Sequence, residues 1–150
     1  MATVNVGTMM GRANEVVEMV GRREIDFCSV QETRWKGESA RMIEGGDKRY
    51  KFFWKGCKEV GGSGVGILVA EKWVDNVVEV RRISERIMVL KVAIGKQVFN
   101  IVSAYAPQVG RSAMDEERFW MSMMKEIVKL KETVFAGDGI RMWRHERARG

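Results

Sequence analysis

Three apolar segments follow one another closely in the middle of the chain, and they constrain its fold most. They span 77–83, 87–94 and 97–105, and Gly95-Lys96 between the last two is typical of a tight hairpin turn. The middle segment is apolar on both faces of an extended chain. A strand of this kind belongs in the interior, covered on both sides. The sequence therefore predicts a layered protein with a buried sheet.

The rest of the chain supplies helices and further strands. Strands are also expected over 2–6, 25–30, 50–54, 65–70 and 134–136. Helices are expected over 12–23 and 112–131, a loop over 36–48, and turns over 56–64 and 72–76. Because the first helix lies between two strands, the N-terminal part is expected to form a parallel crossover. The predicted buried face of the second helix comprises Phe119, Trp120, Met123, Ile127 and Leu130.

Length and charge limit the possible classes of function. The chain has 150 residues, enough for one domain with a core, and a net charge of +6. Half of that charge lies in the last ten residues, so the body is only mildly basic. The charge therefore permits a phosphate-bearing partner but does not require one. Residues 140–150 are expected to form a basic, disordered tail.

Membrane insertion and a cysteine framework are both disfavoured. The uninterrupted apolar runs, such as Ile67–Ala70, are far too short to span a bilayer, so no membrane partner is expected. The two cysteines, Cys28 and Cys57, are not arranged as a CxxC pair. A zinc site or disulfide framework is therefore not expected, and the pattern is typical of a reduced, intracellular protein.

Four predicted strands each end in a polar, chemically capable side chain. These side chains are Asn5, Glu32, Tyr105 and Asp138. In an α/β sheet such ends gather along one edge, where ligands usually bind, so Glu32 and Asp138 are candidates to share a hard divalent cation. Taken singly, Glu32 could be a solvated carboxylate paired with Arg34, and Asp138 a turn residue.

The sequences around these residues resemble the motifs of a known superfamily. Five blocks occur in order: Thr3–Val6, Ser29–Arg34, Ser63–Gly66, Ala104–Pro107 and Ala136–Asp138. They are similar to the blocks of the endonuclease/exonuclease/phosphatase superfamily. The closest resemblance is to the apurinic-type endonuclease domain of non-LTR (LINE) retrotransposons, a group that includes craniofacial development protein 2-like sequences. It implies a partial domain over 1–139, a truncated four-layer α/β/β/α sandwich of DNase I type, with a mixed sheet and helices on its outer face.

The resemblance also implies an activity and residue roles. The superfamily hydrolyses phosphodiesters with Mg²⁺ or Mn²⁺, so DNA is the expected partner and the nucleus the expected location. Glu32 falls on the metal-binding glutamate, and Asn5 on the asparagine that hydrogen-bonds near the phosphate and metal. Tyr105 falls on the tyrosine that contacts the scissile phosphate, and Asp138 on the aspartate that orients or deprotonates the attacking water.

Two neighbours of the metal glutamate are implied to bind substrate. Arg34 and Trp35 directly follow the Gln-Glu-Thr block, where the superfamily meets nucleic acid. Arg34 offers a cation, and Trp35 offers a large aromatic surface.

The sequence also departs from the pattern. Val4 stands where the superfamily has tryptophan, and Ile140 stands where it has a second phosphate-binding asparagine. The C-terminal Asp-His pair has no counterpart, and His145 is given no catalytic role. These departures keep an alternative open, a catalytically inactive remnant that binds nucleic acid weakly or is merely structural. A third reading, a phospholipid or inositol phosphate substrate, is disfavoured by the retrotransposon-like blocks.

A partial domain is also expected to leave apolar surface uncovered. Because the resemblance covers only the first half of the superfamily domain, the inner face of the sheet is predicted to lack its cover and to promote self-association. The residues expected on that face are Val89, Leu90, Ile94, Phe99 and Ile101.

Overall fold

The computed structural model describes residues 1–57, 63–106, 113–127, 132–138 and 140–146. They form two five-stranded sheets, each built from a continuous part of the chain. None of the helices in these ranges has the length and hydrophobicity that crossing a lipid bilayer requires.

The N-terminal part of the chain forms the first sheet, sheet A. Its strand order is β1 (Ala2–Asn5), β2 (Phe27–Gln31), β5 (Val65–Ala70), β4 (Lys48–Lys55) and β3 (Glu38–Gly45). Helix α1 (Ala13–Arg22) connects β1 to β2, and these two strands pair in parallel. The predicted crossover is therefore confirmed.

The second sheet, sheet B, follows a short 3₁₀ helix, η1 (Glu71–Asn76). Its strand order is β10 (Ile140–Glu146), β9 (Glu132–Asp138), β8 (Gln97–Tyr105), β7 (Ile87–Ile94) and β6 (Val77–Ser84). Helix α2 (Ala113–Ile127) connects β8 to β9, which also pair in parallel. Each sheet thus contains one parallel pair joined by a helix.

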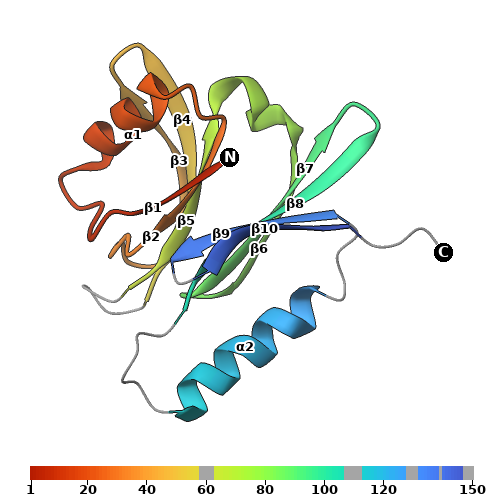
Figure 1. Cartoon of the computed structure of the whole chain (residues 1–150). Coiled ribbons are helices and arrows are strands. Elements are labelled where there is room, and N and C mark those ends of the chain that lie inside the picture. The colour runs from red at the N-terminus through yellow and green to blue at the C-terminus, as the bar shows by residue number, and fades with distance from the viewer. Residues whose placement is uncertain (58–62, 107–112, 128–131, 139, 147–150) are drawn as a thin grey trace.

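The two sheets pack face to face, with one helix on each outer side (Figure 1). Val16, Val17 and Val20 of α1 pack on sheet A, and Phe119 and Met123 of α2 pack on sheet B. A third cluster fills the space between the sheets, with buried members Phe53, Val65, Ile67, Val69, Met88, Leu90, Val92, Ile101 and Tyr105. The predicted four-layer α/β/β/α sandwich is confirmed.

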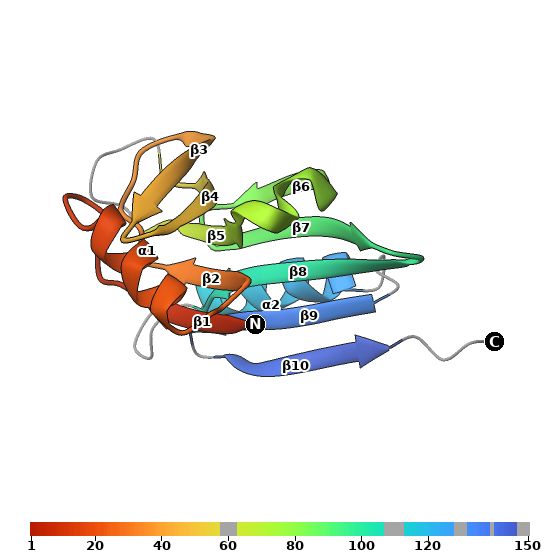
Figure 2. The same ribbon diagram turned by 90° about the horizontal axis from the view of Figure 1, so that it is seen from above.

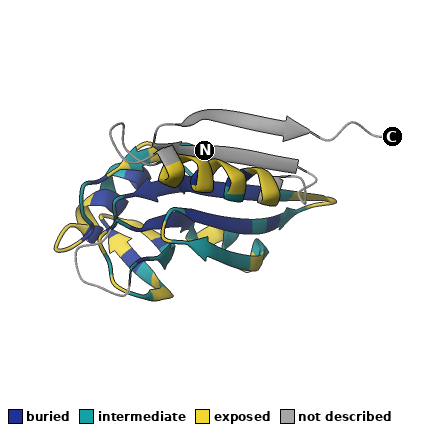
Figure 3. Ribbon diagram, turned by 90° about the horizontal axis from the view of Figure 1, so that it is seen from below, coloured by how far each residue is buried: buried dark blue, intermediate teal, exposed yellow. Residues whose placement is uncertain are grey.

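The two sheets stack with their strands in matching order, from β1 and β10 at one side to β3 and β6 at the other (Figure 2). Strands β1 and β2 of sheet A lie against β9 and β8 of sheet B. Burial is greatest in the central strands, whereas the outer surface of α2 is exposed (Figure 3). The parallel pair β1–β2 of sheet A therefore faces the parallel pair β9–β8 of sheet B across the layer between the sheets.

Strand β3 occupies the segment that was predicted to be a loop. Residues 38–45 pair along their whole length with β4, from Glu38 opposite Lys55 to Gly45 opposite Lys48. The strand is at the edge of sheet A, and most of its side chains are polar and exposed or half-buried. Its pairing depends on backbone hydrogen bonds to β4, which hydrophobic periodicity does not reveal.

Strand β10 corrects the expectation of a disordered tail over residues 140–146. It pairs antiparallel with β9, with Trp143 opposite Phe135 and Glu146 opposite Glu132. A free strand edge offers backbone groups to any neighbouring segment, whatever its side-chain pattern. The rest of the expected tail, 147–150, lies outside the described residues.

The predicted buried face of α2 is correct only in part. Phe119 and Met123 are buried, but Trp120 is 41% exposed. The side chains of Ile127 and Leu130 lie outside the described part of the chain. Phe119 and Met123, four residues apart, pack on sheet B, whereas the neighbouring Trp120 and Met121 face solvent.

The predicted uncovered sheet face is covered by the chain itself. Leu90 and Ile101 are buried between the sheets, and Val89 is buried under α2. Ile94 and Phe99 are half-buried. The expectation of self-association assumed that this face is uncovered. That assumption was wrong, because sheets A and B cover each other.

The central layer should dominate the stability of the fold. Ile67 is fully buried between the sheets, whereas Val78 is 59% exposed. We expect Ile67→Ala to lower the free energy of unfolding by about 2–5 kcal/mol, because it leaves a cavity in this layer. Val78→Ala, the control, should change it by less than about 0.5 kcal/mol. Urea denaturation measures both, and equal effects would contradict the assigned layer.

Candidate functional site

A hydrogen bond between Tyr105 and Glu32 joins the ends of the two sheets. The Tyr105 hydroxyl donates to Glu32 Oε1 at 2.6 Å, across 73 residues of sequence. Glu32 follows the end of β2, and Tyr105 is the last residue of β8. A distance this short is typical of a hydroxyl bound to an ionised carboxylate. The carboxylate is half-buried, so the contact holds it in a defined position.

Strand register brings the other two predicted residues to the same end. Asn5 pairs with Gln31, the residue before Glu32, and Asp138 pairs with Tyr105. Both pairs are parallel, so all four strands end on one side of the sandwich. The predicted meeting of strand ends is therefore observed, although it is formed by two facing sheets rather than by one edge.

The backbone around Glu32 has an unusual conformation. Glu32 and Arg34 have φ angles of 56° and 57°, in the left-handed region that side chains rarely adopt. Each such residue costs about 1–2 kcal/mol. Neighbouring loops hold the segment in place: Thr33 donates its N–H to Gly64 O and accepts one from Met9. The surrounding loops therefore stabilise a turn that presents the Glu32 carboxylate.

Gly7 connects two of the predicted site residues. Its N–H donates to Asn5 Oδ1 at 3.0 Å, and its carbonyl accepts from Arg34 Nε at 2.6 Å. Gly7 itself has a φ of 69°, which suits glycine. The loop after β1 thus fixes both the Asn5 amide and the Arg34 guanidinium beside the end of β2.

Trp35 lies on the other face of sheet A. Its ring packs edge-on against Phe52 and Trp54, with centroid distances of 5.3 Å and 4.8 Å. Phe52 belongs to the core cluster beneath α1, away from the layer that contains Tyr105. The Arg41 guanidinium lies over the Trp35 ring at 4.4 Å. Trp35 therefore contributes to packing, whereas the other five predicted residues surround the strand ends.

Arg86, which sequence reasoning missed, contacts Tyr105 in three ways. Its Nη1 donates to the Tyr105 carbonyl at 3.2 Å, and its own carbonyl accepts the Tyr105 N–H at 2.9 Å. Its guanidinium lies 5.2 Å from the centre of the Tyr105 ring. No sequence signal marks it, because it is one arginine in a polar turn between two strands.

Beneath the Glu32–Tyr105 contact, the layer between the sheets contains polar side chains. Ser29, Gln31 and Ser103 are fully buried. Alternation along β2 and β8 directs them into this layer, the same side as Phe27 and Tyr105. Ser29 Oγ, Gln31 Nε2 and Ser103 Oγ have no hydrogen-bond partner among the described residues. The interior is thus polar next to the site and apolar elsewhere.

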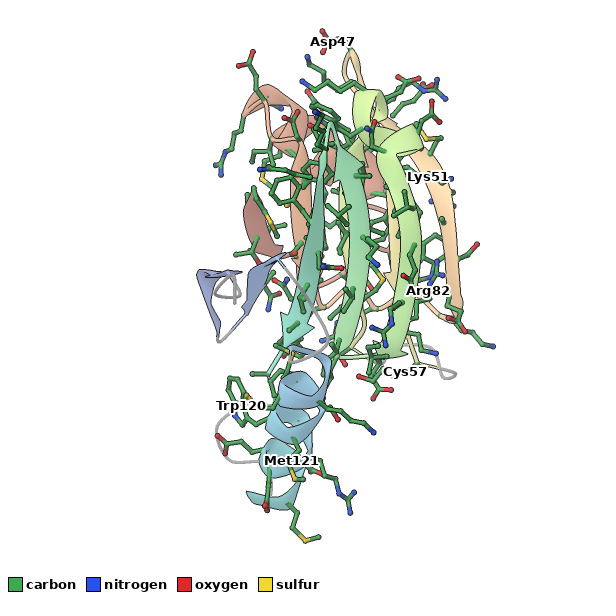
Figure 4. The ribbon with its side chains drawn as sticks, turned by 90° about the vertical axis from the view of Figure 1, so that its right-hand side faces the viewer. Asp47, Lys51, Cys57, Arg82, Trp120 and Met121 are labelled. Atoms are coloured by element: carbon green, nitrogen blue, oxygen red, sulfur yellow. The ribbon has the colours of Figure 1, made fainter. Side chains whose placement is uncertain are left out.

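Cys57 links the loop before β5 to the turn that carries Arg86. Its thiol is hydrogen-bonded to the Glu85 carboxylate, and burial followed by this negative charge raises the pKa of the thiol. Figure 4 shows Cys57 at the end of the sheets from which α2 projects, whereas Asp47 lies at the opposite end. The Glu85–Arg86 turn is therefore attached to the loop before β5 through Cys57 and to the end of β8 through Tyr105.

Two cavities lie at opposite ends of the sandwich. The larger, about 710 Å³, is lined by Asp47, Asp26 and Lys72, far from Glu32. The smaller, about 360 Å³, is lined by Arg86 and the first turns of α2. In the part of the chain that the structure describes, no three His, Cys, Asp or Glu side chains gather as a metal-binding group. The candidate site is therefore identified by the residues at the ends of the strands and not by the volume of a cavity.

The structure is similar to solved enzymes of one superfamily. The catalytic domain of Xenopus laevis APE2 has a TM-score of 0.69 and 11% identity, over 91% of this chain and 56% of that one. The 3′ phosphatase NExo from Neisseria, bound to a product DNA hairpin, has a TM-score of 0.61 and 14% identity, over 91% and 55%. The endonuclease domain of TRAS1, a telomere-specific non-LTR retrotransposon, has 0.58 and 14%, over 91% and 56%.

These proteins are members of the DNase I-like endonuclease/exonuclease/phosphatase superfamily, so the chain has that fold. It spans a little over half the length of these neighbours. No protein-family model and no curated protein matches the sequence.

The Glu32–Tyr105 contact should be measurable as a coupling energy. In a double-mutant cycle with Glu32→Gln and Tyr105→Phe, we expect a coupling of about 1.5–3 kcal/mol in unfolding free energy, as for hydrogen bonds to charged groups. Tyr50→Phe is the control, because that hydroxyl donates to Ile25 O instead. A coupling near zero for Tyr105, equal to that of the control, would contradict the contact.

Alkylation of Cys57 should report on its contact with Glu85. Because Glu85 raises the pKa of the Cys57 thiol, the thiolate forms only at higher pH, and iodoacetamide should react slowly near neutral pH. Glu85→Gln should lower that pKa and speed the reaction severalfold, whereas Glu79→Gln should not. Cys28, whose pKa burial raises to about 12, should stay unmodified. Mass spectrometry measures both sites, and an unchanged Cys57 rate in Glu85→Gln would disprove the link.

Proposed function

We propose that this chain, which has the fold of the DNase I-like endonuclease/exonuclease/phosphatase superfamily, hydrolyses phosphodiester bonds of DNA with a divalent metal ion. The observation that carries the proposal is the 2.6 Å hydrogen bond between Tyr105 and Glu32. It joins a carboxylate suited to a cation and a phenol suited to a phosphate. They meet at strand ends, where α/β proteins usually bind ligands.

The side chains at this end suit Mg²⁺ or Mn²⁺. Glu32 supplies a half-buried carboxylate, and Asn5 supplies an amide oxygen, which also accepts the N–H of Gly7. Mg²⁺ prefers hard oxygen donors, typically one or two carboxylates with water and substrate phosphates. We assign Glu32 as the metal ligand; when bound, the ion polarises a phosphoryl oxygen.

The remaining residues take roles that follow from their chemistry and position. Asp138, the register partner of Tyr105, orients or deprotonates the attacking water. The Tyr105 hydroxyl donates its single hydrogen to Glu32 in this structure; when Glu32 binds the metal ion, that hydrogen turns to the scissile phosphate. Asn5 donates a hydrogen bond beside it. Arg34, just beyond the end of β2, neutralises phosphate charge. Trp35 offers nucleic acid only the part of its ring that its contacts with Phe52 and Trp54 leave open.

We further propose that the substrate is chromosomal DNA and that the domain derives from a non-LTR retrotransposon. The motif blocks and the likeness to the TRAS1 endonuclease domain support this origin. The neighbour bound to a product DNA hairpin supports DNA as the partner. Such a substrate would place the protein in the nucleus.

The second candidate is a catalytically inactive domain that retains the fold. Ile140 cannot make the polar contact with phosphate that an asparagine makes in that position. Glu32 is also without two further His, Cys, Asp or Glu side chains in a metal-binding group, as far as the described residues extend. Both observations favour weak nucleic-acid binding without turnover.

Plasmid nicking separates the two candidates. With Mg²⁺, we expect the chain to convert supercoiled plasmid to the open-circular form, and Glu32→Ala to reduce this to background, because the metal ligand is lost. Asp138→Ala should lower the rate by about 10²–10⁴-fold, as removal of a general base does. Glu18→Ala is the control and should be fully active, because Glu18 is a half-exposed residue on α1 bonded to Arg22.

Two results would count against hydrolysis. Nicking that persists unchanged in Glu32→Ala would show that another protein or another site is responsible. No nicking by the wild-type chain, with no Mg²⁺ binding in titration calorimetry, would establish the inactive domain instead.

A further inference from the structure

The smaller cavity lies beside Tyr105, between the β6–β7 turn and α2, and it is named here the rim cleft. Its volume is about 360 Å³. The polar residues that line it are Ser84, Glu85, Arg86, Asp115, Arg118 and Ser122. We propose that the rim cleft binds one backbone phosphate of the DNA strand that enters at Glu32 and Tyr105. The inference rests on the proposed function and names a second point of contact with its substrate.

Two guanidinium groups in the rim cleft lack a carboxylate partner. Arg118 is exposed and forms no ion pair or hydrogen bond with another described residue. Arg86 is hydrogen-bonded to the carbonyl of Tyr105, a neutral acceptor. Three other exposed arginines are paired with carboxylates, as Arg12–Glu15, Arg22–Glu18 and Arg49–Glu44. The charge in the rim cleft is therefore available to an external anion.

Arg86 makes the rim cleft continuous with the proposed reaction centre. Its guanidinium contacts both the carbonyl and the ring of Tyr105, and the same side chain lines the cleft. Tyr105 is in turn hydrogen-bonded to Glu32. A strand with one phosphate at Tyr105 would therefore carry a neighbouring phosphate toward Arg86 and Arg118.

The other polar groups of the cleft suit a single phosphate. Ser84 Oγ accepts the N–H of Arg86 at 3.1 Å, which leaves its hydroxyl hydrogen for an acceptor such as phosphate. Ser122 adds a second hydroxyl. The Glu85 carboxylate is hydrogen-bonded to Cys57. Together with Asp115, it keeps the cleft from being a broad basic surface, so binding depends on direct contact with the arginines.

Salt-dependent DNA binding tests the rim cleft without requiring turnover. The probe is a short fluorescent DNA duplex, measured by anisotropy in EDTA over a range of salt concentrations. We expect Arg118→Gln to weaken binding and to reduce the slope of log K against log salt by about 0.9, the loss of one phosphate contact. Arg118→Lys, which keeps the charge, should retain most of the slope.

Arg23→Gln is the matched control. Arg23 is also an exposed arginine, but it follows the end of α1, on the other outer side of the sandwich, so its loss should leave the slope unchanged. A slope for Arg118→Gln equal to that of the wild type would overturn the inference, as would no DNA binding by the wild-type chain. Nicking is a separate readout: its Glu32 dependence tests the proposed function whether or not Arg118 contributes to binding.

Discussion

The hydrogen bond from Tyr105 to Glu32 is the interaction on which the rest of the site depends. It connects β2 of one sheet to β8 of the other at the end where both parallel pairs terminate. Without it, Glu32 would be a carboxylate on a strained loop, and Tyr105 would be an aromatic residue at the edge of the core. With it, the two sheets hold a carboxylate and a phenol at hydrogen-bond distance, beside the ends of both parallel pairs.

The polar side chains buried beneath the Tyr105–Glu32 hydrogen bond lower the stability of the fold. Apolar side chains fill most of the layer between the sheets, yet Ser29, Gln31 and Ser103 stand in it under the site. A buried polar group without a partner costs about 1–3 kcal/mol, and the left-handed residue Glu32 adds to that cost. The apolar remainder of the layer has to offset both, which fits the rule that strain concentrates at functional sites.

Most helices and strands, and the meeting of the strand ends at one side of the sandwich, could be predicted from the sequence. Runs such as 87–94 are apolar on both faces, so they predict covered strands whatever covers them. The sequence was insufficient where a partner far along the chain decides the outcome. Residues 38–45 are polar but pair with β4, Trp120 was expected inside and faces solvent, and Leu90 is covered by sheet A. Arg86 belongs to the site only because β6 and β7 bring its turn to Tyr105.

The division of the chain by η1 has a kinetic consequence. Sheet A uses residues 2–70 only, and sheet B uses residues 77–146 only. Each sheet can therefore form from contacts within its own half, and short-range contacts form faster than distant ones. Glu32 and Tyr105 meet only after the two halves dock, because 73 residues separate them. The site is thus among the last features to appear in folding, and its formation reports that docking is complete.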